Sequence, residues 1–232
     1  MSSAPLILTD QDLVFSDFDA TISLIDTGLA MINSLPAPEQ AEAWASEHRW
    51  RRGEIGSMEC LREQWGLWQG SATEMFALID SLQVDERFFD FLALVRARGA
   101  GLAIVSDGLQ FYLDRMMARH GLRTCADDAC AQSTDCLLRF SNPSAVTDAG
   151  VSIEFPYANE CGQCGNCKAS HLFRLRRGFV RTIYIGDGHS DLCAARYAEV
   201  IFAKDALAED CLRAGRAFYP FSDFSGILSA VQ

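Results

Sequence analysis

The chain has 232 residues, and its 20 basic and 31 acidic side chains give it a formal net charge of −11. Hydrophobic residues make up 49% of the chain and charged residues 22%, which excludes a disordered polypeptide and supports a packed core. The excess of acidic side chains argues against a nucleic-acid partner, because phosphate backbones are bound by clustered Lys and Arg.

The N-terminal segment has none of the features of an export signal. Residues 1–8 carry no basic side chain, and no stretch of the sequence reaches the roughly 18 apolar residues that cross a membrane. We therefore expect a cytoplasmic protein with no membrane partner. The nine cysteines are an odd number in a chain large enough to fold without disulfides, so we expect them to be reduced.

Four short apolar runs predict the strands of a parallel sheet. They cover residues 13–16, 101–105, 180–185 and 200–203, and each is apolar on both faces, as expected for strands covered by helices on two sides. Helical patterns lie between them, including an apolar stripe over residues 88–95. The alternation predicts an α/β fold with a doubly wound, Rossmann-like parallel sheet.

A long helical segment interrupts this alternation after the first strand. Residues 24–82 have helical patterns and no convincing strand. We expect them to form a small helical cap domain, inserted into a core domain that comprises residues 1–23 and 83–232. A second interruption contains two apolar runs, 137–140 and 151–155, on either side of a Gly-containing turn; these runs predict a β-hairpin.

The first predicted strand ends in an acidic motif, Asp17-Phe18-Asp19-Ala20-Thr21. Residues two apart on an extended chain point the same way, so the carboxylates of Asp17 and Asp19 are expected to face one site. A divalent cation or a shared proton would relieve their repulsion. Taken alone, the motif is equally consistent with an ordinary acidic loop.

The second predicted strand ends in Ser106-Asp107-Gly108. A hydroxyl and the backbone N–H groups of a turn that opens a helix suit a phosphate group, although a simple helix cap explains the same residues. Lys168 is one of only two lysines in the chain and lies before the third strand. It could bring a positive charge to a phosphoryl group.

The third predicted strand ends in Gly186-Asp187-Gly188-His189-Ser190-Asp191. Asp187 and Asp191 are one helical turn apart, so both can face one site. Carboxylate oxygens are the ligands that suit Mg²⁺.

The four motifs together resemble those of the haloacid dehalogenase superfamily of aspartyl-phosphate phosphatases, whose motifs are Asp-x-Asp-x-Thr, a Ser or Thr, a Lys, and Gly-Asp-x-x-x-Asp. The resemblance covers essentially the whole chain. The position of the cap and the glycines in Ser106-Asp107-Gly108 and Gly186-Asp187-Gly188 are similar to those of the phosphoserine phosphatase branch. The cysteine-rich run 161–168 resembles a sub-branch that holds the methionine-salvage 2-hydroxy-3-keto-5-methylthiopentenyl-1-phosphate phosphatases and the phosphoethanolamine/phosphocholine phosphatases.

This resemblance implies a Mg²⁺-dependent hydrolase that cleaves a small phosphorylated metabolite through an aspartyl-phosphate. It implies that Asp17 is the nucleophile and that Asp19 is the general acid and base. It further implies that the phosphoryl group is held by Ser106, Asp107, Gly108 and Lys168. The implied Mg²⁺ ligands are Asp17, the backbone carbonyl of Asp19, and Asp187, with Asp191 in support.

Substrate choice is expected to come from the cap. Asp26 lies where phosphoserine phosphatases carry a Glu that meets the substrate amine, and the resemblance therefore makes it a candidate for an amine or a hydroxyl. Arg52 and Arg62 are further substrate-binding candidates, with a solvated arginine face as the alternative.

Three alternatives stay open on the sequence. One is a phosphotransferase or phosphomutase of the same superfamily, and another is a non-catalytic, phosphatase-like regulatory binding module. The third concerns Cys161, Cys164 and Cys167, whose spacing allows a metal site if His171 or another cysteine supplies a fourth ligand. A reduced, Gly-rich loop that positions Lys168 is the simpler interpretation of these three cysteines.

Overall fold

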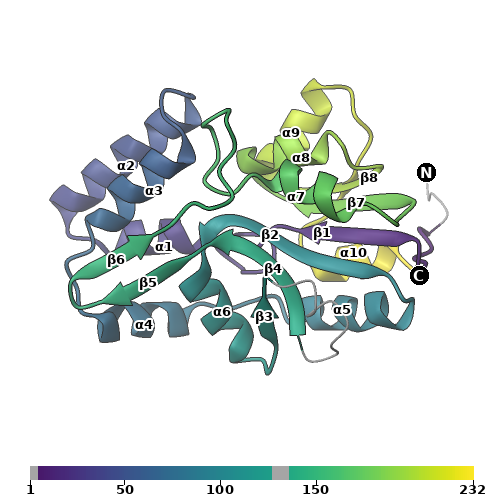
Figure 1. Ribbon diagram of the computed structural model, residues 1–232, viewed down its shortest axis with the longest axis horizontal. Coiled ribbons are helices and arrows are strands. Elements are labelled where there is room, and N and C mark those ends of the chain that lie inside the picture. The colour runs from purple at the N-terminus through teal and green to yellow at the C-terminus, as the bar shows by residue number, and fades with distance from the viewer. Residues whose placement is uncertain (1–4, 127–135) are drawn as a thin grey trace.

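The centre of the molecule is a sheet of seven parallel strands (Figure 1). The computed structural model describes residues 5–126 and 136–232. The strand order β3-β4-β2-β1-β7-β8-β9 confirms the predicted doubly wound α/β fold. The strands are β1 (Asp12–Ser16), β2 (Gly101–Leu109), β3 (Arg123–Cys125), β4 (Cys136–Asn142), β7 (Arg181–Gly186), β8 (Val200–Ala203) and β9 (Tyr219–Pro220).

Both faces of the sheet are covered by helices, which explains why the strands are apolar on both sides. Val14 of β1 packs with α5, α6 and α10 on one face, whereas Leu13 and Phe15 pack with α7, α8 and α9 on the other. The helices are α5 (Arg87–Ala97), α6 (Gln110–Ala118), α7 (Lys168–Leu175), α8 (Leu192–Ala195), α9 (Asp205–Arg213) and α10 (Phe224–Ala230).

The segment between β1 and α5 is helical, as the sequence indicates. It contains α1 (Thr27–Ser34), α2 (Ala37–Arg51), α3 (Ser57–Gly66) and α4 (Ala72–Ser81). Local signals set the helix starts: Asp26 caps α1, and Ser71 and Glu74 form a capping box at α4. In Figure 1, α2 and α3 lie beyond the end of the sheet where β1 and β2 finish.

The predicted hairpin forms with its turn and second arm near where expected, but its first arm comes from other residues. The run 137–140 belongs to β4, which pairs with β2 in the main sheet and is buried along its whole length. The hairpin instead joins β5 (Ser144–Thr147) to β6 (Gly150–Ile153). The prediction that 137–140 forms a hairpin arm was wrong. An apolar run that is buried on both faces is typical of a parallel strand inside a sheet, which is where this run lies.

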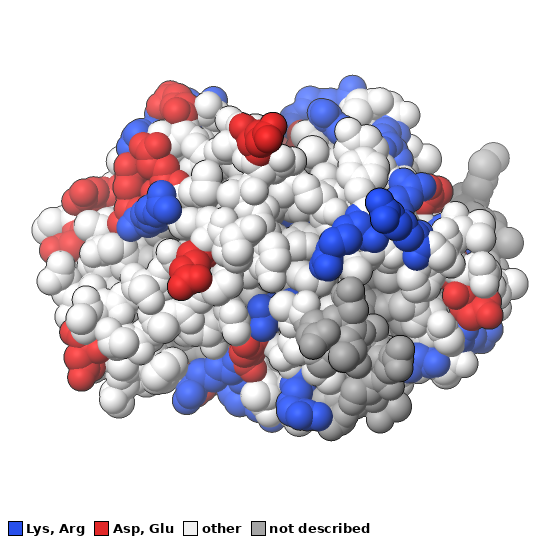
Figure 2. All heavy atoms as spheres, viewed as in Figure 1, with Lys and Arg blue, Asp and Glu red and all other residues white. Residues whose placement is uncertain are grey.

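Charged side chains of both signs are scattered over the face seen in Figure 2, most of which is uncharged. Acidic side chains gather over α2 and α3, and a group of Lys and Arg lies over the end of α7. The net charge of −11 therefore does not produce a uniformly acidic surface on this face. Within the described ranges, no helix is both long and apolar enough to cross a membrane.

The helical segment contacts the loop before α7 through backbone groups. The N–H of Ser57 donates to the carbonyl of Gln163 at 2.8 Å, and the N–H of Gly165 donates to the hydroxyl of Ser57 at 2.8 Å. The preceding residue, Gly56, lies so close to this loop that a Cβ atom there would be 2.3 Å from the carbonyl oxygen of Gly162. Only glycine permits this approach.

We expect Gly56→Ala to destabilise the protein by about 1–3 kcal/mol, because neither backbone can move away without breaking the contact. Gly66→Ala is the control, since a Cβ atom at this glycine, the last residue of α3, meets nothing within 4 Å. The control is expected to be neutral or more stable by up to about 1 kcal/mol, because alanine is the better helix former. Urea unfolding followed by circular dichroism measures both, and equal stabilities of the two variants would contradict the tight contact.

Candidate active site

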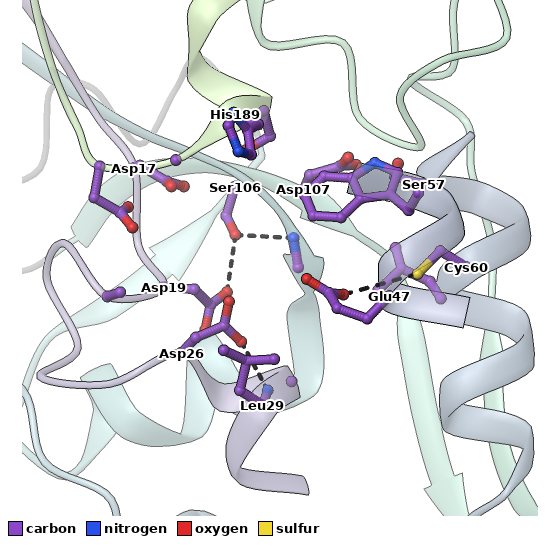
Figure 3. A pocket seen from close by; sticks show the side chains of 18 of the residues that line it. Asp17, Asp19, Asp26, Leu29, Glu47, Ser57, Cys60, Ser106, Asp107 and His189 are labelled. Atoms are coloured by element: carbon purple, nitrogen blue, oxygen red, sulfur yellow. Dashed lines mark hydrogen bonds between the residues drawn. The ribbon is translucent and has the colours of Figure 1, made fainter. Parts of the chain in front are cut away.

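A cavity of about 310 Å³ lies where the carboxyl ends of β1, β2 and β7 meet the helical segment (Figure 3). Most of the residues singled out in the sequence line it, although they are far apart along the chain. The predicted residues that line it are Asp17, Asp19, Asp26, Ser106, Asp107, Gly108, Lys168 and Asp187. The sheet produces this convergence, because parallel strands end at the same edge and β1 lies where the strand order reverses.

Lys168 forms two ion pairs at the floor of the cavity. Its ammonium Nζ lies 2.8 Å from Asp17 Oδ1 and 2.6 Å from Asp191 Oδ1, and all three side chains are less than 10% exposed. Burial alone would lower the pKa of Lys168, but the two carboxylates outweigh burial and raise it. Lys168 therefore stays charged.

Asp191 is fully buried, and four donors surround its carboxylate. Oδ1 accepts from Lys168 and from the hydroxyl of Tyr184, while Oδ2 accepts from the backbone N–H groups of Asp187 and Gly188. Asp191 thus fixes both the lysine and the loop that carries Asp187. Its oxygens are already engaged, which suits a supporting position.

Asp17, Asp187 and Asp191 form a cluster that fits a divalent cation. One carboxylate oxygen of each lies within 4.8 Å of the others, and the described residues contain no second group of His, Cys, Asp or Glu of this kind. Burial, together with Asp191, raises the pKa of Asp187 to about 7, and burial and the neighbouring carboxylates raise the pKa of Asp17. A cation would relieve this repulsion and leave both groups ionised.

The charge balance of the whole cavity supports the same conclusion. Among the described residues, seven carboxylates line it, whereas Lys168 and Arg51 are its lysine and arginine side chains. An anionic ligand such as a phosphate could not enter without further positive charge. The hard carboxylate oxygens of Asp17 and Asp187 are ligands of the kind that Mg²⁺ prefers.

Asp19 is held beside this cluster by three donors. Its Oδ2 accepts from the hydroxyl of Tyr112 at 2.6 Å and from Ser106 at 3.4 Å, and its Oδ1 accepts from the backbone N–H of Thr27 at 3.0 Å. A Cβ atom on Gly108 would lie 1.7 Å from the Tyr112 oxygen and 2.4 Å from the Asp19 carboxylate. Gly108 therefore lets the helix after β2 approach Asp19.

Ala20 takes a left-handed backbone conformation, with a φ of 54°. Such a φ is unfavourable for alanine, and strained residues of this kind concentrate at functional sites. The turn that it makes is followed by Thr21, whose hydroxyl donates to Asp187 at 2.8 Å. The loop after β1 is thereby tied to the loop after β7.

The helical segment supplies the opposite wall of the cavity. Asp26 accepts from the N–H of Leu29, and burial together with the nearby Asp19 raises its pKa to about 7. Glu47 is buried, pairs with Arg51 at 2.8 Å and accepts from Gln64 at 3.0 Å. This wall is therefore acidic, with aromatic side chains contributed by Trp50 and Trp65.

Arg52 and Arg62 do not line the cavity. Arg52 is exposed and pairs with Glu54 at 2.6 Å, and the guanidinium of Arg62 lies 4.9 Å from the centre of the Phe155 ring. The arginine that reaches the cavity is the neighbouring Arg51. Sequence reasoning missed Arg51, Glu47 and Tyr112; for Tyr112 a signal was present, because it lies four residues after Gly108, in the first turn of the helix that follows β2.

The three clustered cysteines do not gather into a metal site in the described structure. The sulfur of Cys167 accepts from Ser170, and burial raises the pKa of Cys164 to about 12. His171, the possible fourth ligand, instead contacts Asn166 at 2.6 Å. The arrangement agrees with a reduced loop that leads into Lys168.

Comparison with known proteins gives matches over nearly the whole chain. Residues 14–196 match the haloacid dehalogenase-like hydrolase family. A protein of Geobacillus kaustophilus named 2-hydroxy-3-keto-5-methylthiopentenyl-1-phosphate phosphatase is 30% identical over 232 residues, covering 97% of both chains. One of the same name from Bacillus velezensis is 25% identical over 230 residues, covering 97% of this chain and 92% of that protein.

A solved structure shares the fold. The phospho-aspartyl intermediate analogue of a phosphoserine phosphatase has a TM-score of 0.66 and 19% sequence identity, and the match covers 95% of this chain and 98% of that one. At this identity the similarity extends to the arrangement of helices and strands. It supports the architecture described above, including the helical segment after β1.

The carboxylate cluster predicts that Mg²⁺ stabilises the folded protein. At about one hundred times its Kd, a ligand adds about 2.7 kcal/mol to the free energy of unfolding. Asp187→Asn should lose most of the Mg²⁺-dependent rise in Tm. Without the metal, however, the variant should be more stable than the natural protein, because one source of carboxylate repulsion is gone.

Differential scanning fluorimetry with Mg²⁺ or with a chelator measures both effects. Asp90→Asn is the control, because Asp90 is an exposed carboxylate on α5 that pairs only with Arg87 in the described structure. The control should respond to Mg²⁺ as the natural protein does. An undiminished Mg²⁺ response in Asp187→Asn would show that the cation binds elsewhere.

Proposed function

Because the chain belongs to the haloacid dehalogenase-like hydrolases, we propose that it is a Mg²⁺-dependent phosphatase that hydrolyses a small phosphate monoester through an aspartyl-phosphate. The observation that carries this proposal is the cluster at the cavity floor. There Asp17 lies against the ammonium of Lys168, beside Asp187 and within one cavity with Asp19 and Ser106. The two relatives described above are both named as phosphatases, which supports it.

Hydrolysis takes place in two steps. A carboxylate oxygen of Asp17 attacks phosphorus, and a new O–P bond forms as the bond between phosphorus and the substrate oxygen breaks. Asp19 donates the proton that the leaving oxygen requires. Asp19 then takes a proton from a water molecule as that water attacks the aspartyl-phosphate, which releases inorganic phosphate and restores Asp17.

The remaining residues hold the phosphoryl group and balance its charge. Ser106 and Lys168 would donate to the phosphoryl oxygens, assisted by the N–H groups at Asp107 and Gly108. Mg²⁺ would be held by Asp17, the carbonyl of Asp19 and Asp187, and when bound it supplies positive charge against which two anions can approach. Asp191 supports this set by holding Lys168 and the loop of Asp187.

In this proposal the chemistry belongs to residues 1–23 and 83–232, and substrate choice belongs to the helical segment 24–82. The size of the cavity supports a small metabolite as substrate. The first compound to test is the 2-hydroxy-3-keto-5-methylthiopentenyl-1-phosphate for which the relatives are named. The acidic wall formed by Asp26 and Glu47 also supports including phosphoserine, phosphoethanolamine and phosphocholine in a panel.

Asp17→Asn tests the proposed chemistry directly. The substitution keeps the shape of the side chain but removes the nucleophile, so phosphatase activity should fall by at least about a thousandfold. Activity is measured with p-nitrophenyl phosphate and Mg²⁺, and circular dichroism confirms the fold. Asp90→Asn should retain full activity. Substantial turnover by Asp17→Asn would refute the assignment, and absence of turnover by the natural protein on the whole panel would refute the proposed function.

Asp26→Asn tests the role of the acidic wall. Asparagine still caps α1, so the substitution removes the charge without removing the cap. If Asp26 meets an amine or hydroxyl of the substrate, kcat/KM for the best compound of the panel should fall about ten- to a hundredfold, the equivalent of about 1–3 kcal/mol. p-Nitrophenyl phosphate has no such group and should lose much less. Equal losses for both compounds would assign Asp26 a structural role instead.

A further inference from the structure

The loop before α7 contains a side chain that the proposed chemistry does not use. Asn166 is completely buried, does not line the cavity, and makes hydrogen bonds to four other residues. A buried amide that satisfies its donors and its acceptor fixes the geometry of everything it contacts. Its partners belong to the parts of the chain that carry Ser106 and Lys168.

Asn166 bonds directly to the end of β2. Its side-chain Nδ2 donates to the carbonyl oxygen of Ser106 at 2.8 Å, and its backbone N–H donates to Asp107 Oδ1 at 2.7 Å. The same Nδ2 donates to the carbonyl oxygen of Phe140 at 2.8 Å, at the neighbouring strand β4. One residue therefore holds two strand ends and the phosphate-binding turn.

The opposite end of the amide is fixed by α7. Asn166 Oδ1 lies 2.6 Å from Nε2 of His171, which is buried between the rings of Phe140 and Tyr157. The two carbonyl contacts require Nδ2 to face them, so Oδ1 must accept and His171 Nε2 must carry the proton. Burial lowers the pKa of His171 to about 4, which leaves the ring neutral.

Lys168 begins α7, between Asn166 and His171 in the sequence. Asn166 precedes it by two residues, and His171 follows it by three. The helix that presents the ammonium to Asp17 is thus bonded, through one amide, to the backbone of Ser106. Within the proposed function, the relative position of Ser106 and Lys168 decides whether both can contact one phosphoryl group.

We propose that Asn166 is a positioning residue that sets the relative position of Ser106 and Lys168, with His171 holding the amide in the required orientation. The inference rests on the proposed function, because it assigns a task within the same site. It explains why a neutral amide occupies the position. A carboxylate of the same shape would place an acceptor oxygen against the carbonyl oxygens of Ser106 and Phe140, which are acceptors themselves. An alkyl side chain would leave both carbonyl oxygens without the donor that Asn166 supplies.

The principal test compares Asn166→Asp with Asn159→Asp. The same chemical change is made twice in one loop, once at the buried amide and once at an exposed one. Misplacement of catalytic groups by about an ångström costs on the order of a hundredfold in rate. Asn166→Asp should therefore lower kcat on p-nitrophenyl phosphate by about that factor and raise the Ki of inorganic phosphate, whereas Asn159→Asp should stay within about twofold of the natural protein.

Activities are measured well below the Tm of each variant, so that a loss of stability alone cannot lower kcat. A folded Asn166→Asp with kcat and phosphate Ki within about threefold of the natural protein would overturn the positioning role. If the natural protein itself turns over no phosphate monoester, it is the proposed function that fails. The two failures are therefore distinguishable.

A second pair of variants decides the question if Asn166→Asp does not fold. His171→Leu removes the donor to Asn166 Oδ1 and leaves the amide itself in place. We expect it to lower kcat by about tenfold, and His171→Gln, whose amide can again donate, to recover part of the loss. A His171→Leu enzyme with unchanged kcat would overturn the role given to the Asn166–His171 pair.

Discussion

The structure depends on the buried ammonium of Lys168, which lies between Asp17 and Asp191. Three carboxylates are brought within 4.8 Å at the carboxyl edge of the sheet, and a fold that buries them needs compensating positive charge. Removing one partner from such a buried pair typically costs about 3–5 kcal/mol, since an uncompensated charge remains. Lys168 offsets part of the negative charge, and the remainder suits the divalent cation of the proposed function.

The parallel sheet makes this concentration of charge possible. Polar loops follow β1, β2 and β7, three adjacent strands with continuous apolar cores, and all three loops meet where the strand order reverses. Hydrogen bonds then join the loops to one another. Thr21 bonds to Asp187, Asp191 bonds to Lys168, and Tyr112 bonds to Asp19, so each reactive group is held by an element other than its own.

The walls of the cavity come from two parts of the chain. The sheet edge supplies Asp17, Ser106 and Asp187, to which the proposed function assigns the phosphoryl group and the metal, whereas the helical segment supplies Asp26 and Glu47. The loop of residues 162–168 contacts both parts. It bonds to Ser57 of the helical segment and, through Asn166, to Ser106 of the sheet. One loop therefore links the position of the helical segment to that of Ser106, the residue proposed to bind phosphate.

The sequence by itself determined the sheet class, the helical segment and the core of the site. Asp17, Ser106 and Asp187 each follow an apolar strand, and parallel strands end at one edge, so their meeting follows from local pattern and topology together. The sequence could not distinguish a hairpin arm from a central strand at residues 137–140, because a short apolar run fits either. Nor could it show that Arg51 rather than Arg52 reaches the cavity, that Glu47 and Tyr112 line it, or that Asn166 bonds to the backbone of Ser106. These side chains lie on helices and a loop, where the direction of a residue is decided by what the element packs against, and only the tertiary structure fixes that packing.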